Sequence, residues 1–215
     1  MSVEAVGALR EPLRRAVYEF AAGRDEPVGR DEVAEAVGIG RTLAAFHLDR
    51  LAEAGLLEVS YARRSGRTGP GAGRPAKLYR RSVAELEVSL PPRRYRSAAG
   101  LLAEAVDRSG ADELLFEAAR EQGRAAGRAA AGAGLVEVLT GQGYEPQPRD
   151  DAILLRNCPF HLLARDYPPL VCGMNLALLQ GLVQELGPPA ATARMAPGAD
   201  GCCVVIEVAS KNNGS

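Results

Sequence analysis

The sequence of 215 residues predicts an α+β protein with two domains. Apolar residues recur at helical spacing through the first fifty positions, and a glycine-rich basic segment between two short apolar runs follows them. Helical and short strand patterns occur together again after the pair Pro91-Pro92. We therefore expect an N-terminal domain of helices and a hairpin over residues 1–84, a linker over 85–96, and a C-terminal α/β domain over 97–215.

Charge is divided unevenly between these two parts. Residues 1–84 carry 14 lysines and arginines against 11 aspartates and glutamates, whereas residues 85–215 carry 12 against 16. A basic N-terminal part and an acidic C-terminal part are typical of a DNA-binding module joined to a sensing or dimerising one.

The N-terminal domain is expected to hold three helices, over Val3–Ala22, Arg30–Val37 and Arg41–Ala54. The third would turn Ala44, Leu48 and Leu51 inward, and a glycine-bearing turn at residues 38–40 would join it to the second. Two short helices with such a turn form a helix-turn-helix, whose second helix enters the major groove of DNA.

The outward residues of this second helix are candidates for DNA contact: Arg41, Thr42, Ala45, Phe46 and Arg50. Arg41 is the strongest candidate for a base contact, because a guanidinium can pair with guanine through two hydrogen bonds. The alternative is a solvated arginine that touches phosphate only. His47 is also a candidate, and we expect it to pack or to contact phosphate rather than to read a base.

A basic hairpin follows the helices. Leu56–Tyr61 and Ala76–Arg80 are expected to be antiparallel strands, and no acidic residue occurs from Val59 to Ala84. The basic residues that would meet DNA are Arg63, Arg64, Arg67, Arg74 and Lys77. Directly after a helix-turn-helix, such a loop is a wing that neutralises phosphates or lies in the minor groove, although a solvated loop is the alternative.

The run GIGRTLAAFHLDRLAEAGLLEV, followed by GRPAKLY, resembles the winged-helix regulators of the ArsR/DeoR type over about residues 5–84. The resemblance implies a winged helix-turn-helix domain that binds double-stranded DNA.

Small side chains mark one face of the helix expected over Asp112–Ala131, where they are Ala118, Ala119, Gly123, Ala125, Ala126 and Gly127. They would let another helix approach closely, either in a dimer or within the chain. Further helices are expected over Ser97–Arg108 and Leu135–Gln142.

All four cysteines lie in the back half of the chain. Cys158 ends a strand expected over Ala152–Arg156, and Cys172 lies in the first turn of a helix expected over Leu170–Leu186. Cys202 and Cys203 begin a strand expected over Cys202–Val208, paired with Thr192–Met195. Between them, Pro159–Arg165 is expected to be a helical turn that carries His161.

Three thiolates and one further donor would form a metal or cluster site. Side chains alternate along a strand, so we expect Cys202 and Cys203 to point to opposite faces and one of them to join Cys158 and Cys172. His161 is the fourth donor within the chain, with Asp166 or an external ligand as alternatives. The spacing matches neither a closed zinc finger nor a compact ferredoxin run, so buried inert cysteines, a disulfide or a thiol switch stay open.

The segments NCPFHLLA, LVCGMNLALLQGLV and CCVVIEV resemble the sensor half of the Suf-operon repressors, the SufR-like iron–sulfur regulators. The resemblance implies a 4Fe–4S cluster on Cys158, Cys172 and one of Cys202 or Cys203, with zinc or no metal as alternatives. It also implies a homodimer that binds operator DNA as a repressor.

The sequence thus predicts a DNA-binding transcription regulator, not an enzyme, that senses iron–sulfur status or oxidants through the cluster. In one alternative the C-terminal domain binds an apolar small molecule in a pocket lined by Leu170–Leu186, and the cysteines are structural. In another, Cys158 or Cys172 is a catalytic nucleophile with His161, but no orienting carboxylate is evident.

We expect a cytoplasmic protein without membrane contact. The segment Met1–Arg15 is charged and lacks the apolar stretch of a secretory signal. The uncharged segment Tyr167–Gln184 contains two prolines, an asparagine and two glutamines, which favours buried core over a membrane span. In the cytoplasm, cysteines are more often metal ligands or redox thiols than disulfides.

Overall fold

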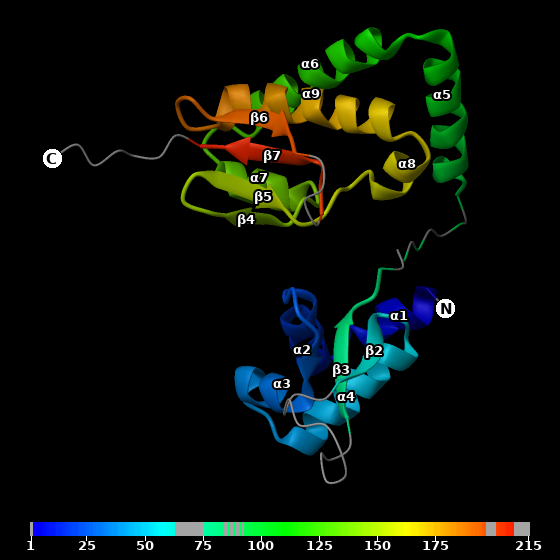
Figure 1. Cartoon of the computed structure of the whole chain (residues 1–215), viewed down its shortest axis with the longest axis vertical. Helices are drawn as coiled ribbons and strands as arrows, with labels where there is room; N and C mark the ends of the chain where they lie inside the picture. The colour runs from blue at the N-terminus through cyan, green and yellow to red at the C-terminus, as the bar shows by residue number, and fades with distance from the viewer. Residues whose placement is uncertain are drawn as a thin grey trace, which may run out of the picture. The chain divides into compact units, whose positions relative to one another are not determined.

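The computed structural model describes residues 2–62, 75–83, 86, 88, 91, 93–196 and 201–208. The chain divides into two compact units, Met1–Arg93 and Arg94–Ser215, and the division falls inside the expected linker. Each unit combines helices with one small antiparallel sheet, so the α+β class is confirmed (Figure 1).

The N-terminal unit contains helices α1 (Ser2–Ala8), α2 (Pro12–Ala22), α3 (Arg30–Val37) and α4 (Arg41–Glu53), and strands β1 (Val28–Gly29), β2 (Leu57–Ala62) and β3 (Ala76–Arg81). The strands lie in the order β1-β3-β2, with Val59 opposite Tyr79. Val17 of α2, Val33 of α3 and Leu48 of α4 are fully buried in one core. This core fixes the helices against one face of the sheet.

The single helix expected over Val3–Ala22 is two helices in the structure, because the helix is interrupted between Ala8 and Pro12. Proline has no N–H to donate, and its ring would clash with the carbonyl group one turn earlier, so the helix cannot continue through it. Glu11 instead caps a new helix, where its carboxylate accepts hydrogen bonds from the N–H groups of Leu13 (3.0 Å) and Arg14 (2.7 Å). The apolar spacing runs across the break and does not reveal it.

The turn between α3 and α4 matches the sequence prediction. Gly38 adopts a φ of 71°, a left-handed conformation that glycine reaches at little cost. At the other end of α3, the Glu32 side chain accepts a hydrogen bond from the N–H of Gly29. On α4, Ala44, Leu48 and Leu51 are all buried, as the helical spacing predicts. Together these features fix the direction in which α4 leaves α3.

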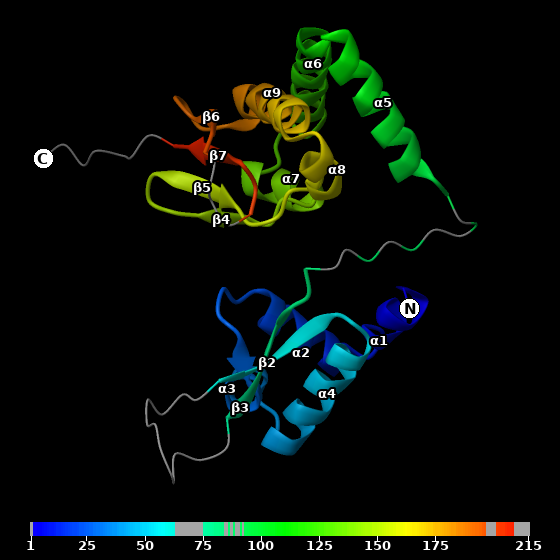
Figure 2. The ribbon, with the colours of Figure 1, turned by 45° about the vertical axis from the view of Figure 1, so that its right-hand side comes forward.

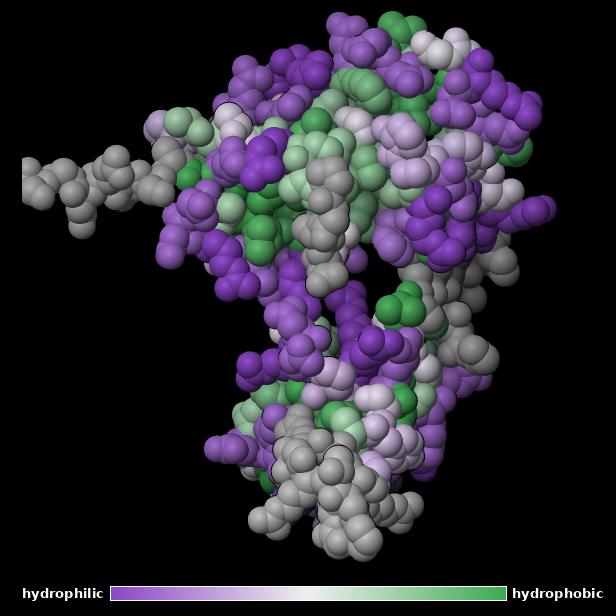
Figure 3. Space-filling model, viewed as in Figure 1, coloured by the Kyte–Doolittle hydropathy of each residue, from purple (hydrophilic) through white to green (hydrophobic). Residues whose placement is uncertain are grey.

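The C-terminal unit contains helices α5 (Tyr95–Ser109), α6 (Asp112–Ala129), α7 (Leu135–Gly141), α8 (His161–Asp166) and α9 (Pro168–Leu186), and strands β4 (Pro146–Pro148), β5 (Ala152–Leu155), β6 (Thr192–Met195) and β7 (Val204–Glu207). The strands form one antiparallel sheet in the order β4-β5-β7-β6. Helix α9 lies between this sheet and α6, as Figures 1 and 2 both show. Figure 3 shows mostly hydrophilic side chains along α5 and α6, and apolar ones beside the sheet.

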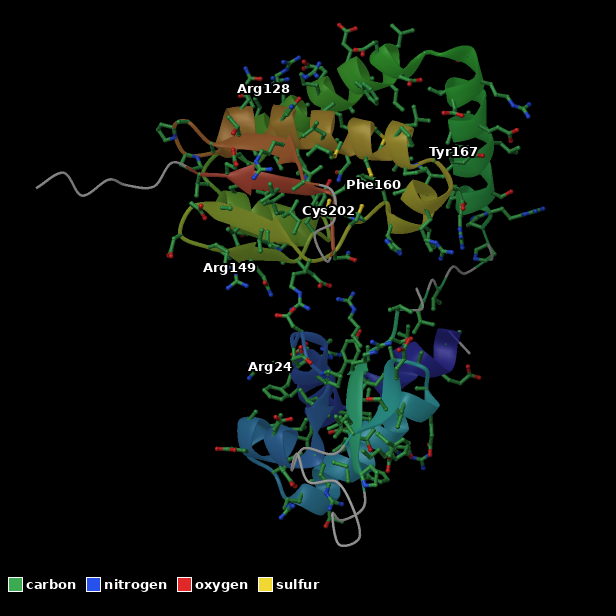
Figure 4. The ribbon with its side chains drawn as sticks, in the orientation of Figure 1. Arg24, Arg128, Arg149, Phe160, Tyr167 and Cys202 are labelled. Carbon is green, nitrogen blue, oxygen red and sulfur yellow. The ribbon has the colours of Figure 1, made fainter. Side chains whose placement is uncertain are left out.

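The face of α6 that carries small side chains packs against α9 within the chain. A Cβ atom on Gly123 would lie far inside van der Waals distance of the Leu178 carbonyl oxygen, and one on Gly181 would meet the Arg120 carbonyl oxygen in the same way. At the far end, Arg128 (labelled in Figure 4) pairs with Glu185 of α9 at 3.4 Å. Of the two alternatives for the small residues, the structure therefore shows contact within the chain.

Helix α9 is part of the core, as expected for the uncharged segment. Leu170, Leu179 and Leu182 are at most 1% exposed. In the part of the chain that the structure describes, every helix falls short of the length and apolar character needed to cross a membrane.

Candidate cysteine site

Three segments bring the cysteines together. Cys158 lies in the connection between β5 and α8, Cys172 lies near the start of α9, and Cys202 and Cys203 directly precede β7. All four are free thiols; Cys202 is buried and the other three are partly buried. Figure 4 labels Cys202 between the sheet and α9.

The four thiols form a row. Neighbouring thiols interact in pairs, Cys158 with Cys202, Cys202 with Cys203, and Cys203 with Cys172. The expectation that Cys202 and Cys203 point to opposite faces stays a prediction. It is based on the alternation of side chains along a strand, and β7 begins only at Val204, after both cysteines.

Backbone contacts hold this segment in place. The N–H of Cys202 donates to the carbonyl oxygen of Leu155 at 2.8 Å, and the N–H of Ala196 donates to that of Cys203 at 2.8 Å. The preceding residue, Gly201, has a φ of 120°, and a Cβ there would lie 2.8 Å from the carbonyl oxygen of Arg156. Glycine is needed at this position because the chain passes so close to the end of β5.

Two buried polar residues support Cys202. The side-chain Nδ2 of Asn175 donates to the Sγ of Cys202 at 3.2 Å, and the hydroxyl of Tyr144 donates to the Oδ1 of Asn175 at 2.6 Å. Both residues are only 1% exposed. The sequence prediction did not include them, although an asparagine inside the apolar run of α9 is a signal that could have pointed to them.

Interactions among the thiols shift their pKa values in different directions. The hydrogen bond between Cys158 and Cys202 raises the pKa of Cys158 and lowers that of Cys202, which Asn175 lowers further. Burial, followed by the contact with Cys172, raises the pKa of Cys203. Burial also raises the pKa of Tyr144, which keeps its hydroxyl protonated as a donor. Cys202 therefore ionises more readily than Cys158, which holds the proton beside it.

The other proposed donors lie apart from this row. His161 is exposed at the start of α8, and among the described residues no hydrogen bond joins its side chain to a thiol. Asp166, at the end of α8, lines a hollow of about 470 Å³ with Arg94, Arg96 and Leu163. Within the described ranges, no three or more His, Cys, Asp or Glu side chains form a group suited to one metal ion.

The predicted DNA-contacting residues of α4 divide into exposed and buried ones. Arg41, Thr42, Phe46 and Arg50 are exposed, and Ala45 is half-buried. Arg41 is held by two hydrogen bonds to the carboxylate of Asp31, at 2.5 and 2.7 Å. The guanidinium of Arg50 lies 5.7 Å from the centre of the Phe46 ring and pairs with Glu53.

His47 is a packing residue. It is 5% exposed, and its Nδ1 accepts a hydrogen bond from the Nε of Arg14 at 3.4 Å. Burial lowers the pKa of His47, which keeps the ring neutral in this environment. The expectation that it packs rather than reads a base is consistent with this placement.

The hairpin is described only in its strands. Lys77 on β3 donates to the carboxylate of Asp49 on α4 at 2.5 Å, and Tyr79 donates to the same carboxylate oxygen at 2.7 Å. Asp49 therefore ties β3 to α4. The remaining wing candidates, Arg63, Arg64, Arg67 and Arg74, lie outside the described residues.

Comparison with known proteins finds no family model, no curated protein and no solved structure that matches the chain.

Proposed function

We propose that the protein is a DNA-binding transcription regulator, acting as a repressor, whose C-terminal unit senses iron–sulfur status or oxidants through a cysteine-bound 4Fe–4S cluster. The observation that carries the proposal is the row of four free thiols contributed by three separate segments. It occurs in the same chain as two short helices, a glycine turn and a basic hairpin.

The chain supplies the type of donor that such a cluster needs. Clusters of this type are held by cysteine thiolates, one to each iron that the protein binds, and their potentials depend on hydrogen bonds to sulfur and on exposure. The thiols interact in neighbouring pairs, Cys158 with Cys202, Cys202 with Cys203 and Cys203 with Cys172, and Asn175 donates a hydrogen bond to the sulfur of Cys202. When bound, the cluster would supply oxidisable, one-electron chemistry that the chain itself lacks.

The N-terminal unit supports the DNA-binding part of the proposal. Helices α3 and α4, joined at Gly38, and the antiparallel hairpin β2–β3 follow one another in the order of a winged helix-turn-helix. The exposed side chains of α4 include two arginines, Arg41 and Arg50, available for phosphate or base contact. These features make α4 the proposed recognition helix and β2–β3 the proposed wing.

Pairing within the unit orients this surface. Asp31 holds the Arg41 guanidinium at the start of α4, and Asp49 holds Lys77 against the same helix. Both pairs are substantially exposed, so each contributes little to stability and can be replaced by a phosphate at modest cost. The cations are thus oriented before DNA arrives.

The link between the two functions lies in the segments that carry the thiols. Cys158 follows β5, Cys202 and Cys203 precede β7, and Cys172 lies near the start of α9. A change in the state of the thiols therefore acts on three elements of one core at once. In a homodimer, a shift of these elements would alter the spacing of the two recognition helices and the half-sites that they can span.

The alternative of an apolar effector pocket along α9 has less support. The apolar side chains of α9, Leu170, Leu179 and Leu182 among them, are packed in the core. The hollow beside α5 and α8 is lined by Gly100, Leu163 and the charged residues Arg94, Arg96 and Asp166, and none of these residues belongs to α9.

The proposal is tested by selecting duplexes from a random-sequence library with the anaerobically purified full chain. We expect a selected sequence with two related half-sites, bound more tightly before exposure to air than after it. The Arg41→Ala variant should lose this selection, whereas Arg24→Ala, which changes an arginine stacked on Phe20 of α2, should keep it. Failure to select any sequence, with salt-sensitive binding to all duplexes alike, would contradict the proposal.

A further inference from the structure

We infer that the outward face of α5 is the surface through which two copies of the chain associate, with the two α5 helices packed antiparallel about a two-fold axis. The inference rests on the proposed function, which needs a homodimer and leaves its interface open. The evidence for it comes from α5, which carries none of the cysteines, so the interface and the cluster can fail separately.

Helix α5 meets the rest of its unit along one narrow side. It packs against α6, α8 and α9, and Figures 1 and 2 both show it at the edge of the C-terminal unit, away from the sheet. Among the 15 described residues of α5, Ala103 alone is buried. A helix of this length is marginal in water by itself and depends on packing an apolar face. The packing of α5 within its own chain uses little of its apolar surface.

The exposed apolar residues of α5 form a stripe. Tyr95, Leu101 and Leu102 are 71%, 67% and 68% exposed, and Ala98 and Ala105 are exposed as well. Residues 95, 98, 102 and 105 follow the alternating spacing of three and four that lines one face of a helix, as in a coiled-coil seam. Leu101 lies beside this seam. Single exposed leucines are ordinary, but a continuous apolar face marks a protein contact.

The seam is complementary in shape to a second copy of itself. It alternates large and small side chains at its centre, where Ala98 and Ala105 lie on either side of Leu102. In an antiparallel pair, Leu102 can lie opposite Ala105 of the partner subunit, and the two-fold axis repeats this contact. Each leucine then fills the space beside an alanine. This register also brings Tyr95 towards the start of α6 of the partner subunit.

Charge favours the antiparallel direction over the parallel one. Three arginines lie at the N-terminal end of α5 and three carboxylates lie at or beyond its C-terminal end: Arg93, Arg94 and Arg96, and Asp107, Asp112 and Glu113. Between these ends, Glu104 and Arg108 pair with each other at 2.9 Å and add no net charge. Parallel helices would bring like charges together, whereas antiparallel helices pair opposite charges and opposed helix dipoles.

Sedimentation equilibrium of the reduced, metal-free full chain tests the inference. We expect a dimer in the micromolar range. Leu102→Glu should raise the dimer dissociation constant about a hundredfold or more, because it places two like charges in the centre of the interface. Leu43→Glu, the same substitution at an exposed leucine of α4, should leave the constant unchanged. Far-UV circular dichroism checks that both variants keep their helices.

Charge reversal tests the direction of the helices. Arg94→Glu and Glu113→Arg should each weaken the dimer, and the chain that carries both substitutions should recover most of the loss. The recovery is specific to the antiparallel pair, because in a parallel pair the doubly reversed chain would again set like charges against each other.

The outcomes separate the interface from the cluster. A monomer throughout the micromolar range, or a dimer that Leu102→Glu leaves intact, overturns the inference even if the protein is brown after anaerobic reconstitution. Single reversals without recovery in the double variant overturn the antiparallel arrangement. A colourless protein that forms the dimer and responds to these variants as expected overturns the cluster and supports the interface.

Discussion

The Nδ2 atom of Asn175 lies 3.2 Å from the Sγ atom of Cys202 and donates a hydrogen bond to it. The other end of the same amide accepts from the Tyr144 hydroxyl, and both residues are buried. A polar pair inside an apolar core is costly unless every group has a partner, and here the thiol is one of those partners. The site is therefore built into the core rather than attached to its surface.

Replacing Asn175 with leucine should destabilise the C-terminal unit by about 1–3 kcal/mol, because it leaves the buried Tyr144 hydroxyl without its acceptor. Urea unfolding measures the change. The Tyr144→Phe variant is the matched control, and the double variant should cost less than the sum of the two single ones, since the residues share one network. Strict additivity would contradict the coupling.

Replacing Gly181 with alanine should separate α6 from α9, because the new Cβ would collide with the backbone of Arg120. We expect a loss of about 1–3 kcal/mol or more, the usual range for overpacking a core. Gly100→Ala on α5 is the control, since nothing lies within 4 Å of a Cβ there, and it should be neutral or stabilising by about 0.5–1 kcal/mol. Equal thermal stability of the two variants would count against the close packing.

The pairing of Asp49 should appear in the pH dependence of stability. Burial raises the pKa of this carboxyl, but hydrogen bonds from Lys77 and Tyr79 outweigh burial and hold it below its ordinary value of 3.8. A carboxyl with a lowered folded pKa contributes stability above its unfolded pKa and loses it as the pH falls through the folded one. Asp49→Asn should therefore be less stable than the unaltered chain near pH 7, with the difference shrinking below about pH 4. A difference that stays constant on acidification would refute the assignment.

If the proposed function holds, arginines of α4 and of the proposed wing should differ in their effect on DNA binding. Arg41→Ala should cost about 1–3 kcal/mol of discrimination at one base position, whereas Arg64→Ala should weaken binding to all sequences and reduce the salt slope by about one. Binding isotherms at several salt concentrations, with matched and mismatched duplexes, measure both quantities. Equal losses on all duplexes for Arg41→Ala would assign it to phosphate contact instead.

Periodicity and turn residues predict most of the regular structure. Gly38 and the inward spacing of Ala44, Leu48 and Leu51 locate α3 and α4, and β6 is predicted to the residue. Periodicity and turn residues do not predict segments that are very short or that contain proline. Strand β1 has only two residues, and β4 runs from Pro146 to Pro148, where proline is tolerated because the strand lies at the sheet edge.

The candidate site could be predicted only in part. Cysteine type and position identify Cys158, Cys172, Cys202 and Cys203 as candidates, but their mutual contacts depend on where β7 begins, which the apolar run from Cys202 does not reveal. Tyr144 lies 31 residues from Asn175 in sequence, and Asn175 lies 27 from Cys202. Partners so far apart are set by tertiary packing, which no local pattern records.

The most direct test of the account is the visible absorption of the anaerobically purified chain, measured together with its iron and acid-labile sulfide. We expect a brown protein with iron and sulfide in equal amounts, bleached by air and colourless when Cys158 is replaced with alanine. A folded protein that remains colourless and free of sulfide after anaerobic reconstitution would contradict it.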